Sequence, residues 1–149
     1  MITDFYGLAA PFGPETVNPA DQKVALLPAA RMVDVIRRAG VVYWANAIAN
    51  VVRAEEVRWL RDRLGETLYA FALANRSLSG PAGKLDLADG ADAQITEDGA
   101  RCLGAWCQSQ PAAIGGRVRL KSPASPAFDD VVHSPFNELG PAIIRRAAA

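Results

Sequence analysis

The chain has 149 residues, of which 50% are hydrophobic and 7% aromatic, a composition that favours packed helices over a β-sandwich. Its 16 lysines and arginines balance 16 aspartates and glutamates, so it lacks the net positive charge that holds nucleic acids. We therefore expect an all-α protein, a single small helical domain with a Pro/Gly-rich N-terminal arm and a Pro/Ser-rich C-terminal segment, and no nucleic-acid partner.

The first residues predict an irregular arm over residues 1–22, because prolines and glycines recur there: Pro11, Gly13, Pro14 and Pro19. This arm does not resemble a secretory signal, since Asp4 comes early and no basic region precedes it. The apolar runs of the chain fall short of the roughly 20 residues that span a bilayer. We expect a cytoplasmic protein without direct membrane insertion, which would reach the inner face of a membrane only through partners.

Two helices are expected between residues 28 and 52. Pro28 suits the first turn of a helix, and Gly40 follows two arginines as a glycine follows a helix end. These signals predict a helix over residues 28–39. Valines, alanines and a tryptophan recur at intervals of three and four in residues 41–52, which predicts a second, mostly buried helix.

The stretch from Glu55 to Leu78 carries the clearest helical pattern in the chain. Five apolar side chains fall within about 80° of one another on a helical wheel, namely Val57, Leu60, Leu64, Leu68 and Phe71. We predict one helix over about residues 55–75, with this stripe in the core.

The opposite side of that helix carries the candidate partner-binding residues, which are Arg58, Trp59, Arg63 and Tyr69. Two interpretations stay open for a tryptophan among charges. Another helix or loop of the same domain covers Trp59, as is common in all-helical proteins. Alternatively, a partner protein binds there, because tryptophan, tyrosine and arginine are enriched at interface hot spots.

The second half of the chain alternates loops and helices. Residues 79–98 are acidic and contain glycines and a proline, which predicts a solvated loop without the ligand spacing of a calcium site. A helical pattern covers about residues 95–109, and Pro111 opens a further helix. We expect the adjacent glycines Gly115 and Gly116 to interrupt or loosen that helix.

A small basic cluster follows, formed by Arg117, Arg119 and Lys121, and we expect it to face solvent. Residues 124–149 predict a Pro/Ser-rich linker and a short C-terminal helix broken at Pro141. This leaves residues 23–123 as the expected helical domain.

The sequence offers no converging set of catalytic groups. His133 is the single histidine and lies in a Pro/Ser-rich segment, where a solvated loop residue is expected. Serine-nucleophile elbows and phosphate-binding glycine loops are absent from the sequence. Cys102 and Cys107 would face different sides of a helix, so we interpret them as small buried hydrophobes. We expect no enzyme activity, no metal and no cofactor.

Residues 50–123 resemble a recurring pattern of the SctK/YscK family of type III secretion proteins. That pattern is an L-G-E-x-x-Y/L-x-F-A-L helix, then a helix started by glycine, a proline and an R-x-x-L-K-x-P tail. The matching positions here are Leu64-Gly65-Glu66, Tyr69, Phe71-Ala72-Leu73, Trp106, Pro111, Arg117, Leu120, Lys121 and Pro123. Family members usually carry more helical sequence ahead of this segment, and the residues after Pro123 lie outside the resemblance.

The resemblance implies a cytoplasmic, non-enzymatic adaptor of the sorting platform beneath the secretion needle complex. Such an adaptor links the pod protein (SctQ type) to the cytoplasmic domain of the inner-membrane ring (SctD type), and it needs no cofactor. A secretion chaperone or another helical protein-binding module is the alternative, although such chaperones tend to be acidic and this chain is neutral. A small enzyme with an unrecognised site is the third possibility.

Overall fold

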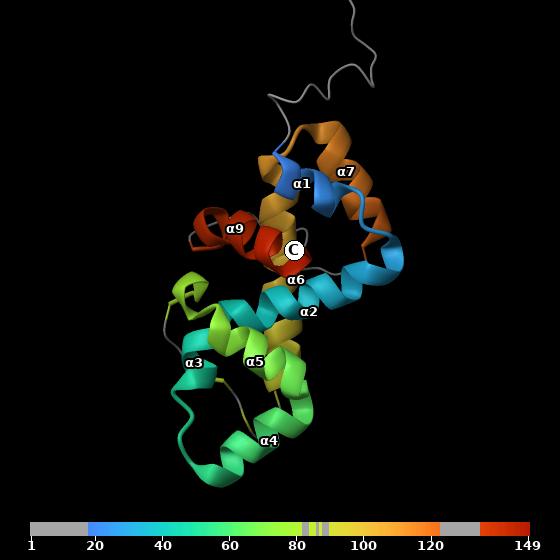
Figure 1. Cartoon of the computed structure of the whole chain (residues 1–149). Coiled ribbons are helices and arrows are strands. Elements are labelled where there is room, and N and C mark those ends of the chain that lie inside the picture. Colours follow the sequence, from blue (N-terminus) through green and yellow to red (C-terminus); the bar gives the residue numbers. More distant parts are fainter. Residues whose placement is uncertain (1–17, 82–83, 86, 88–89, 123–134) are drawn as a thin grey trace, which may run out of the picture.

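The computed structural model describes residues 18–81, 84–85, 87, 90–122 and 135–149. These residues form helices and connecting turns without a strand (Figure 1), so the all-α prediction is confirmed. Residues 1–17 of the predicted arm, most of the predicted linker and His133 lie outside the described residues. Within the described part, no helix has both the length and the apolarity to cross a bilayer.

Helix α1, Pro19–Ala25, begins inside the predicted arm. Asn18 explains the start, because its side-chain oxygen accepts a hydrogen bond from the Ala20 amide at 2.7 Å, and Pro19 occupies the first helical position that proline favours. At the other end, Lys121 Nζ donates to the carbonyl oxygens of Ala25 and Leu27 at 2.8 and 2.7 Å. Lys121 therefore caps α1 instead of only facing solvent.

Helix α2, Ala29–Tyr43, does not end at Gly40 as predicted, and the short helix α3, Ala45–Ala49, follows it. Helix packing explains why residue 40 is a glycine, because a side chain at this position would overlap the backbone of Ile95 on α6. The residues predicted as one buried helix over 41–52 are therefore shared between two helices, and Val52 is 84% exposed.

The predicted helix over residues 55–75 is two helices, α4, Ala54–Leu64, and α5, Glu66–Ala74. Gly65 separates them with φ 83° and ψ 155°, a backbone conformation that is essentially reserved for glycine. Leu60 and Leu64 of the predicted stripe are buried, whereas Val57, Leu68 and Phe71 are half-buried. A short 3-10 turn, Arg76–Leu78, follows α5.

Replacing Gly65 by alanine should lower the free energy of unfolding by about 1–3 kcal/mol, the usual cost of a non-glycine residue in this backbone region. The reason is conformational, because a methyl group at Gly65 has open space around it. Urea unfolding followed by circular dichroism measures the change. An unchanged or increased stability would show that the connection between α4 and α5 does not need this conformation.

The remaining helices are α6, Ala91–Ser109, α7, Ala112–Lys121, and α9, Phe136–Ala148. Helix α6 starts inside the predicted acidic loop. The expected interruptions of α7 at Gly115 and of α9 at Pro141 are wrong, since both helices run through these residues. Gly115 instead lets α7 approach the carbonyl group of Cys107 closely.

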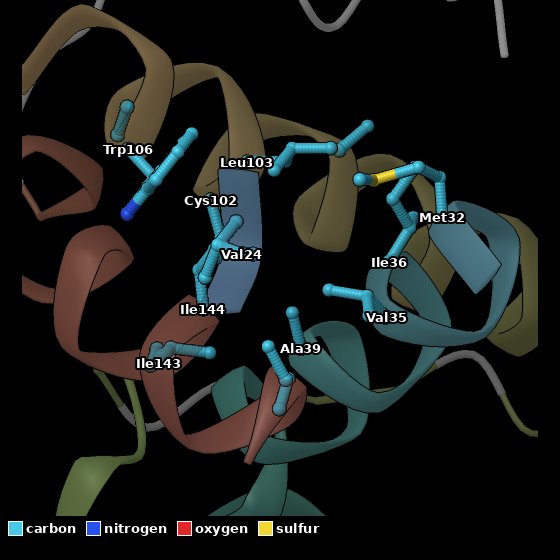
Figure 2. Close-up of a cluster of buried hydrophobic side chains, with 14 of the residues drawn as sticks. Val24, Met32, Val35, Ile36, Ala39, Cys102, Leu103, Trp106, Ile143 and Ile144 are labelled. Carbon is cyan, nitrogen blue, oxygen red and sulfur yellow. The ribbon is translucent and has the colours of Figure 1, made fainter. Parts of the chain in front are cut away.

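Helix α9 belongs to the core even though its residues were predicted to lie beyond the helical domain. Side chains of α1, α2, α6 and α9 meet in the larger apolar cluster (Figure 2), which includes Val24, Met32, Trp106 and Ile143. Each of these four side chains is fully buried. A second cluster joins α3, α4 and α5 to the start of α6 and contains Ile48, Leu60, Leu64 and Ile95.

Candidate functional site

Helix α4 lies at the end of the molecule away from α1 and α7 (Figure 1) and carries three of the four predicted partner-binding residues. Arg58 is exposed. Trp59 is half-buried and packs against the second apolar cluster, so the same domain covers part of it. Packing within the domain therefore covers part of the Trp59 ring, and the rest of the ring remains on the surface.

Arg63 links Trp59 to the neighbouring helices. Its guanidinium carbon lies 5.2 Å from the centre of the Trp59 ring, within the range of a cation–π contact. Its Nε is 3.6 Å from a carboxylate oxygen of Asp92, and Arg37 Nη2 is 3.6 Å from the other. Arg37 also donates to the carbonyl oxygen of Arg63 at 3.1 Å, at the end of α4. These contacts place side chains of α2, α4 and α6 side by side.

Tyr69, the fourth predicted residue, does not share this surface. It is buried, with 9% of its surface exposed, and belongs to the second apolar cluster. The physical reason is Gly65, which breaks the continuous helix on which the prediction relied and turns α5 relative to α4. The guanidinium carbon of Arg61 lies 5.1 Å from the centre of the Tyr69 ring.

A groove of about 230 Å³ opens between α2 and α5, which pack side by side (Figure 1). Both helices contribute to its lining, which is formed by Arg31, Asp34, Arg37, Arg38, Thr67, Leu68 and Phe71. Sequence reasoning missed this site. Arg31, Asp34 and Arg38 are spaced three and four residues apart, a periodicity that indicates one polar face of a helix.

Charge is distributed unevenly in this α2–α5 groove. Arg31 Nε lies 3.7 Å from Asp34, and both side chains are largely exposed, so this pair is weak. Arg38 is half-buried, and its guanidinium carbon lies 4.3 Å from the centre of the Phe71 ring. In the part of the chain that the structure describes, Arg38 has no carboxylate within 4.0 Å. Among the described residues, the charge of Arg38 is therefore stabilised by the Phe71 ring and not by an anion.

We name the continuous surface formed by Arg31, Arg37, Arg38, Arg63 and Trp59 the arginine surface. Arg37 connects its two parts, because it lines the groove and also contacts Arg63 and Asp92. Guanidinium groups beside aromatic rings are typical of protein-binding surfaces, since they present planar donors next to apolar area at a low cost of desolvation.

The described residues do not assemble three or more side chains that could hold a metal ion. Both cysteines are free thiols, with Cys102 buried and Cys107 half-buried. Burial raises the pKa of the Cys102 thiol and raises that of Cys107 to about 11. Both groups are therefore protonated at neutral pH and are poor nucleophiles.

The fold and this surface define a small all-helical protein with an arginine-rich, partly aromatic face. Comparison with curated proteins finds the nodulation protein NolU of Rhizobium fredii, 33% identical over 99 residues, and the protein of the same name from Sinorhizobium fredii with the same identity. The match covers 62% of this chain and 43% of each relative, so the chain spans less than half the length of the curated proteins it matches.

No protein-family model matches the chain. No solved structure matches it either. The resemblance to the SctK/YscK family therefore stays a prediction, supported only by the order of short motifs in residues 50–123.

Proposed function

We propose that the protein is a non-enzymatic adaptor of a type III secretion sorting platform, linking a pod protein to the cytoplasmic domain of the inner-membrane ring. Two likenesses support a secretion-related role: the resemblance of residues 50–123 to SctK/YscK proteins, and the similarity to the nodulation protein NolU. The all-α fold agrees with both.

The observation that carries the adaptor proposal is the arginine surface. It combines a half-buried tryptophan, a half-buried arginine without a carboxylate partner among the described residues, and a groove. Surfaces of this composition supply the anchor residues of protein interfaces.

The hydrogen bonds of the two buried aspartates support the non-enzymatic part of the proposal. Asp98 accepts hydrogen bonds from Trp44 Nε1 at 2.8 Å and from Arg101 Nη1 at 2.7 Å. Asp21 is engaged in the same way by Trp106 and Arg145. Carboxylates committed to such fixed partners hold helices together and are not placed to exchange protons with a substrate.

Co-purification of the full chain with a pod protein and a ring cytoplasmic domain from one secretion system tests the proposal. Arg63→Glu and Trp59→Ala should each weaken binding by about tenfold or more, because each removes an anchor from the same surface. Arg63 forms one exposed ion pair, with Asp92, and a cation–π contact with Trp59. Each is worth about 1 kcal/mol or less at an exposed site, so far-ultraviolet circular dichroism should stay unchanged for Arg63→Glu.

Arg117→Glu is the matched control, since Arg117 is an exposed arginine on α7, a helix that contributes no residue to the arginine surface. Equal losses for Arg63→Glu and Arg117→Glu would indicate a general effect of charge and contradict the assigned surface. Retention of secreted effectors in place of both platform proteins would favour a secretion chaperone over the adaptor.

A further inference from the structure

The α2–α5 groove contains two kinds of binding surface next to each other. Leu68 and Phe71 supply an apolar wall from α5, and they are half-buried because Gly65 turns α5 so that they border the groove. Helix α2 contributes three arginines and one aspartate to the lining, so the lining carries an excess of two positive charges. An occupant that uses the whole groove must be apolar on one side and anionic on the other.

Arg38 is the residue that makes the anionic requirement specific. Its guanidinium carbon lies 4.3 Å from the centre of the Phe71 ring, a cation–π distance, and no carboxylate of the described residues pairs with the group. The other two arginines have partners already, Asp34 for Arg31, and Asp92 with the Arg63 carbonyl for Arg37. A carboxylate is the anion that matches a guanidinium edge in a protein ligand.

We propose that the α2–α5 groove binds an acidic segment of a partner protein, with an apolar side chain against Leu68 and Phe71 and a neighbouring carboxylate paired to Arg38. This proposal deepens the adaptor function and rests on it, because it names the chemistry of one partner. Charge complementarity favours this occupant: a simple phosphate ion would leave the apolar wall unused, and a purely apolar segment would bury the Arg38 charge without an anion.

The pairing should contribute strongly to binding. A hydrogen bond to a charged group is worth about 1.5–3 kcal/mol, which corresponds to roughly 10-fold to 150-fold in the dissociation constant. Replacement of Arg38 by lysine retains the charge but removes the planar guanidinium group that a carboxylate can pair with twice, so it should retain only part of this affinity.

The experiment uses the full chain and a phage-displayed library of random short peptides as the probe. Peptides selected on the wild-type protein should carry Asp or Glu beside Leu, Ile or Phe, and synthetic copies should bind with an affinity measurable by fluorescence anisotropy. Arg38→Gln should weaken this binding by about tenfold or more, Arg38→Lys less, and Arg117→Gln not at all. Amidation of the peptide carboxylates should have the same effect as Arg38→Gln.

Three results would overturn the proposal: selected peptides without acidic residues, equal binding to wild type and Arg38→Gln, or equal losses for Arg38→Gln and Arg117→Gln. Displacement of the peptide by inorganic phosphate at low millimolar concentration would identify a general anion site instead. Self-association through the groove would appear as a dimer in sedimentation velocity that Arg38→Gln dissociates, and it would also overturn the proposal.

Co-purification and peptide binding together distinguish an incorrect assignment of the groove from an incorrect adaptor function. If pod and ring proteins co-purify equally well with wild type and Arg38→Gln, the groove assignment fails while the adaptor function stands. If neither protein co-purifies with the wild type but acidic peptides still require Arg38, the groove stands and the secretion-platform role fails.

Discussion

Substitution of Gly99 by alanine is expected to lower the free energy of unfolding by about 2 kcal/mol, since overpacking costs about 1–3 kcal/mol and is offset in part by the better helix propensity of alanine. Gly99 lies on α6, where a methyl group would overlap the carbonyl oxygen of Ile36 on α2 and lie 2.9 Å from its carbonyl carbon. Backbone atoms cannot rotate away as a side chain does, so α2 and α6 must separate.

The contact is reciprocal, which gives a sharper form of the same prediction. Gly40 of α2 packs on the backbone of Ile95, and Gly99 of α6 packs on that of Ile36, so each glycine lies four residues from the residue that the other one contacts. Once one alanine has forced the two helices apart, the methyl group of the second alanine overlaps less with the facing backbone. The double variant should therefore lose less stability than the sum of the two single variants.

Gly116→Ala is the matched control for both substitutions. Gly116 is also inside a helix, is exposed, and has no atom near the position of an added methyl group. Alanine should stabilise the protein there by about 1 kcal/mol. Urea denaturation at constant pH measures all four variants. Stabilisation by Gly99→Ala similar to that by Gly116→Ala would show that α2 and α6 are not in backbone contact.

The second large effect is expected at Arg145, whose replacement by methionine should cost about 2 kcal/mol of stability at neutral pH. Arg145 Nε donates to Asp21 Oδ1 at 2.7 Å, and Trp106 Nε1 donates to the same oxygen at 2.8 Å. These bonds join α1, α6 and α9. Removal of the arginine takes two hydrogen bonds from the buried Asp21 carboxylate, the second of them long at 3.3 Å, and bonds to charged groups are worth about 1.5–3 kcal/mol.

The pH dependence of this effect has a defined sign. Burial by itself raises the pKa of the Asp21 carboxyl, but the hydrogen bonds from Arg145 and Trp106 outweigh it and hold the pKa below the ordinary value of 3.8. A lowered folded-state pKa contributes stability that is present above 3.8 and is lost as the pH falls through the lower folded value. The difference between wild type and Arg145→Met should therefore shrink in this acidic range.

Two further variants separate the contribution of the Asp21–Arg145 ion pair from other effects of the substitution. Arg145→Met should cost clearly less in an Asp21→Asn background, because the asparagine oxygen still accepts from Trp106 while the charge is gone. Arg117→Met, at an exposed position on α7, should change stability by about 0.5 kcal/mol or less. If Arg145→Met costs no more than Arg117→Met, then the ion pair does not hold α1 and α9 together.

Local patterns predicted the elements whose signals are contained in one segment. The 3–4 spacing of Leu60 and Leu64 predicted their burial, and the apolar pattern around Trp106 predicted a helix there. Patterns of this kind succeed because helix formation and the choice of a buried face depend mainly on side chains within one or two turns. The candidate residues Arg58, Trp59 and Arg63 were found by the same local reasoning.

Predictions that depended on where a helix stops were less successful. Glycine signals a helix end in sequence, yet Gly40, Gly99 and Gly115 lie inside helices because their missing side chains allow another backbone to approach. The sequence pattern predicts that Gly65 lies inside a continuous helix, but Gly65 ends α4. A single sequence does not distinguish these two uses of glycine, since the contact that decides between them involves residues far away in the chain.

Local sequence patterns were enough to predict the all-helical class, most of the helix positions and an arginine-rich helical segment with a tryptophan. The burial of Tyr69 and the position of Arg38 over Phe71 beside a groove depend on how the helices pack. The physical reason is that burial and charge pairing depend on which surfaces are brought together. A side chain 33 positions away in the chain, as Phe71 is from Arg38, contributes nothing to the local pattern from which a helix is predicted.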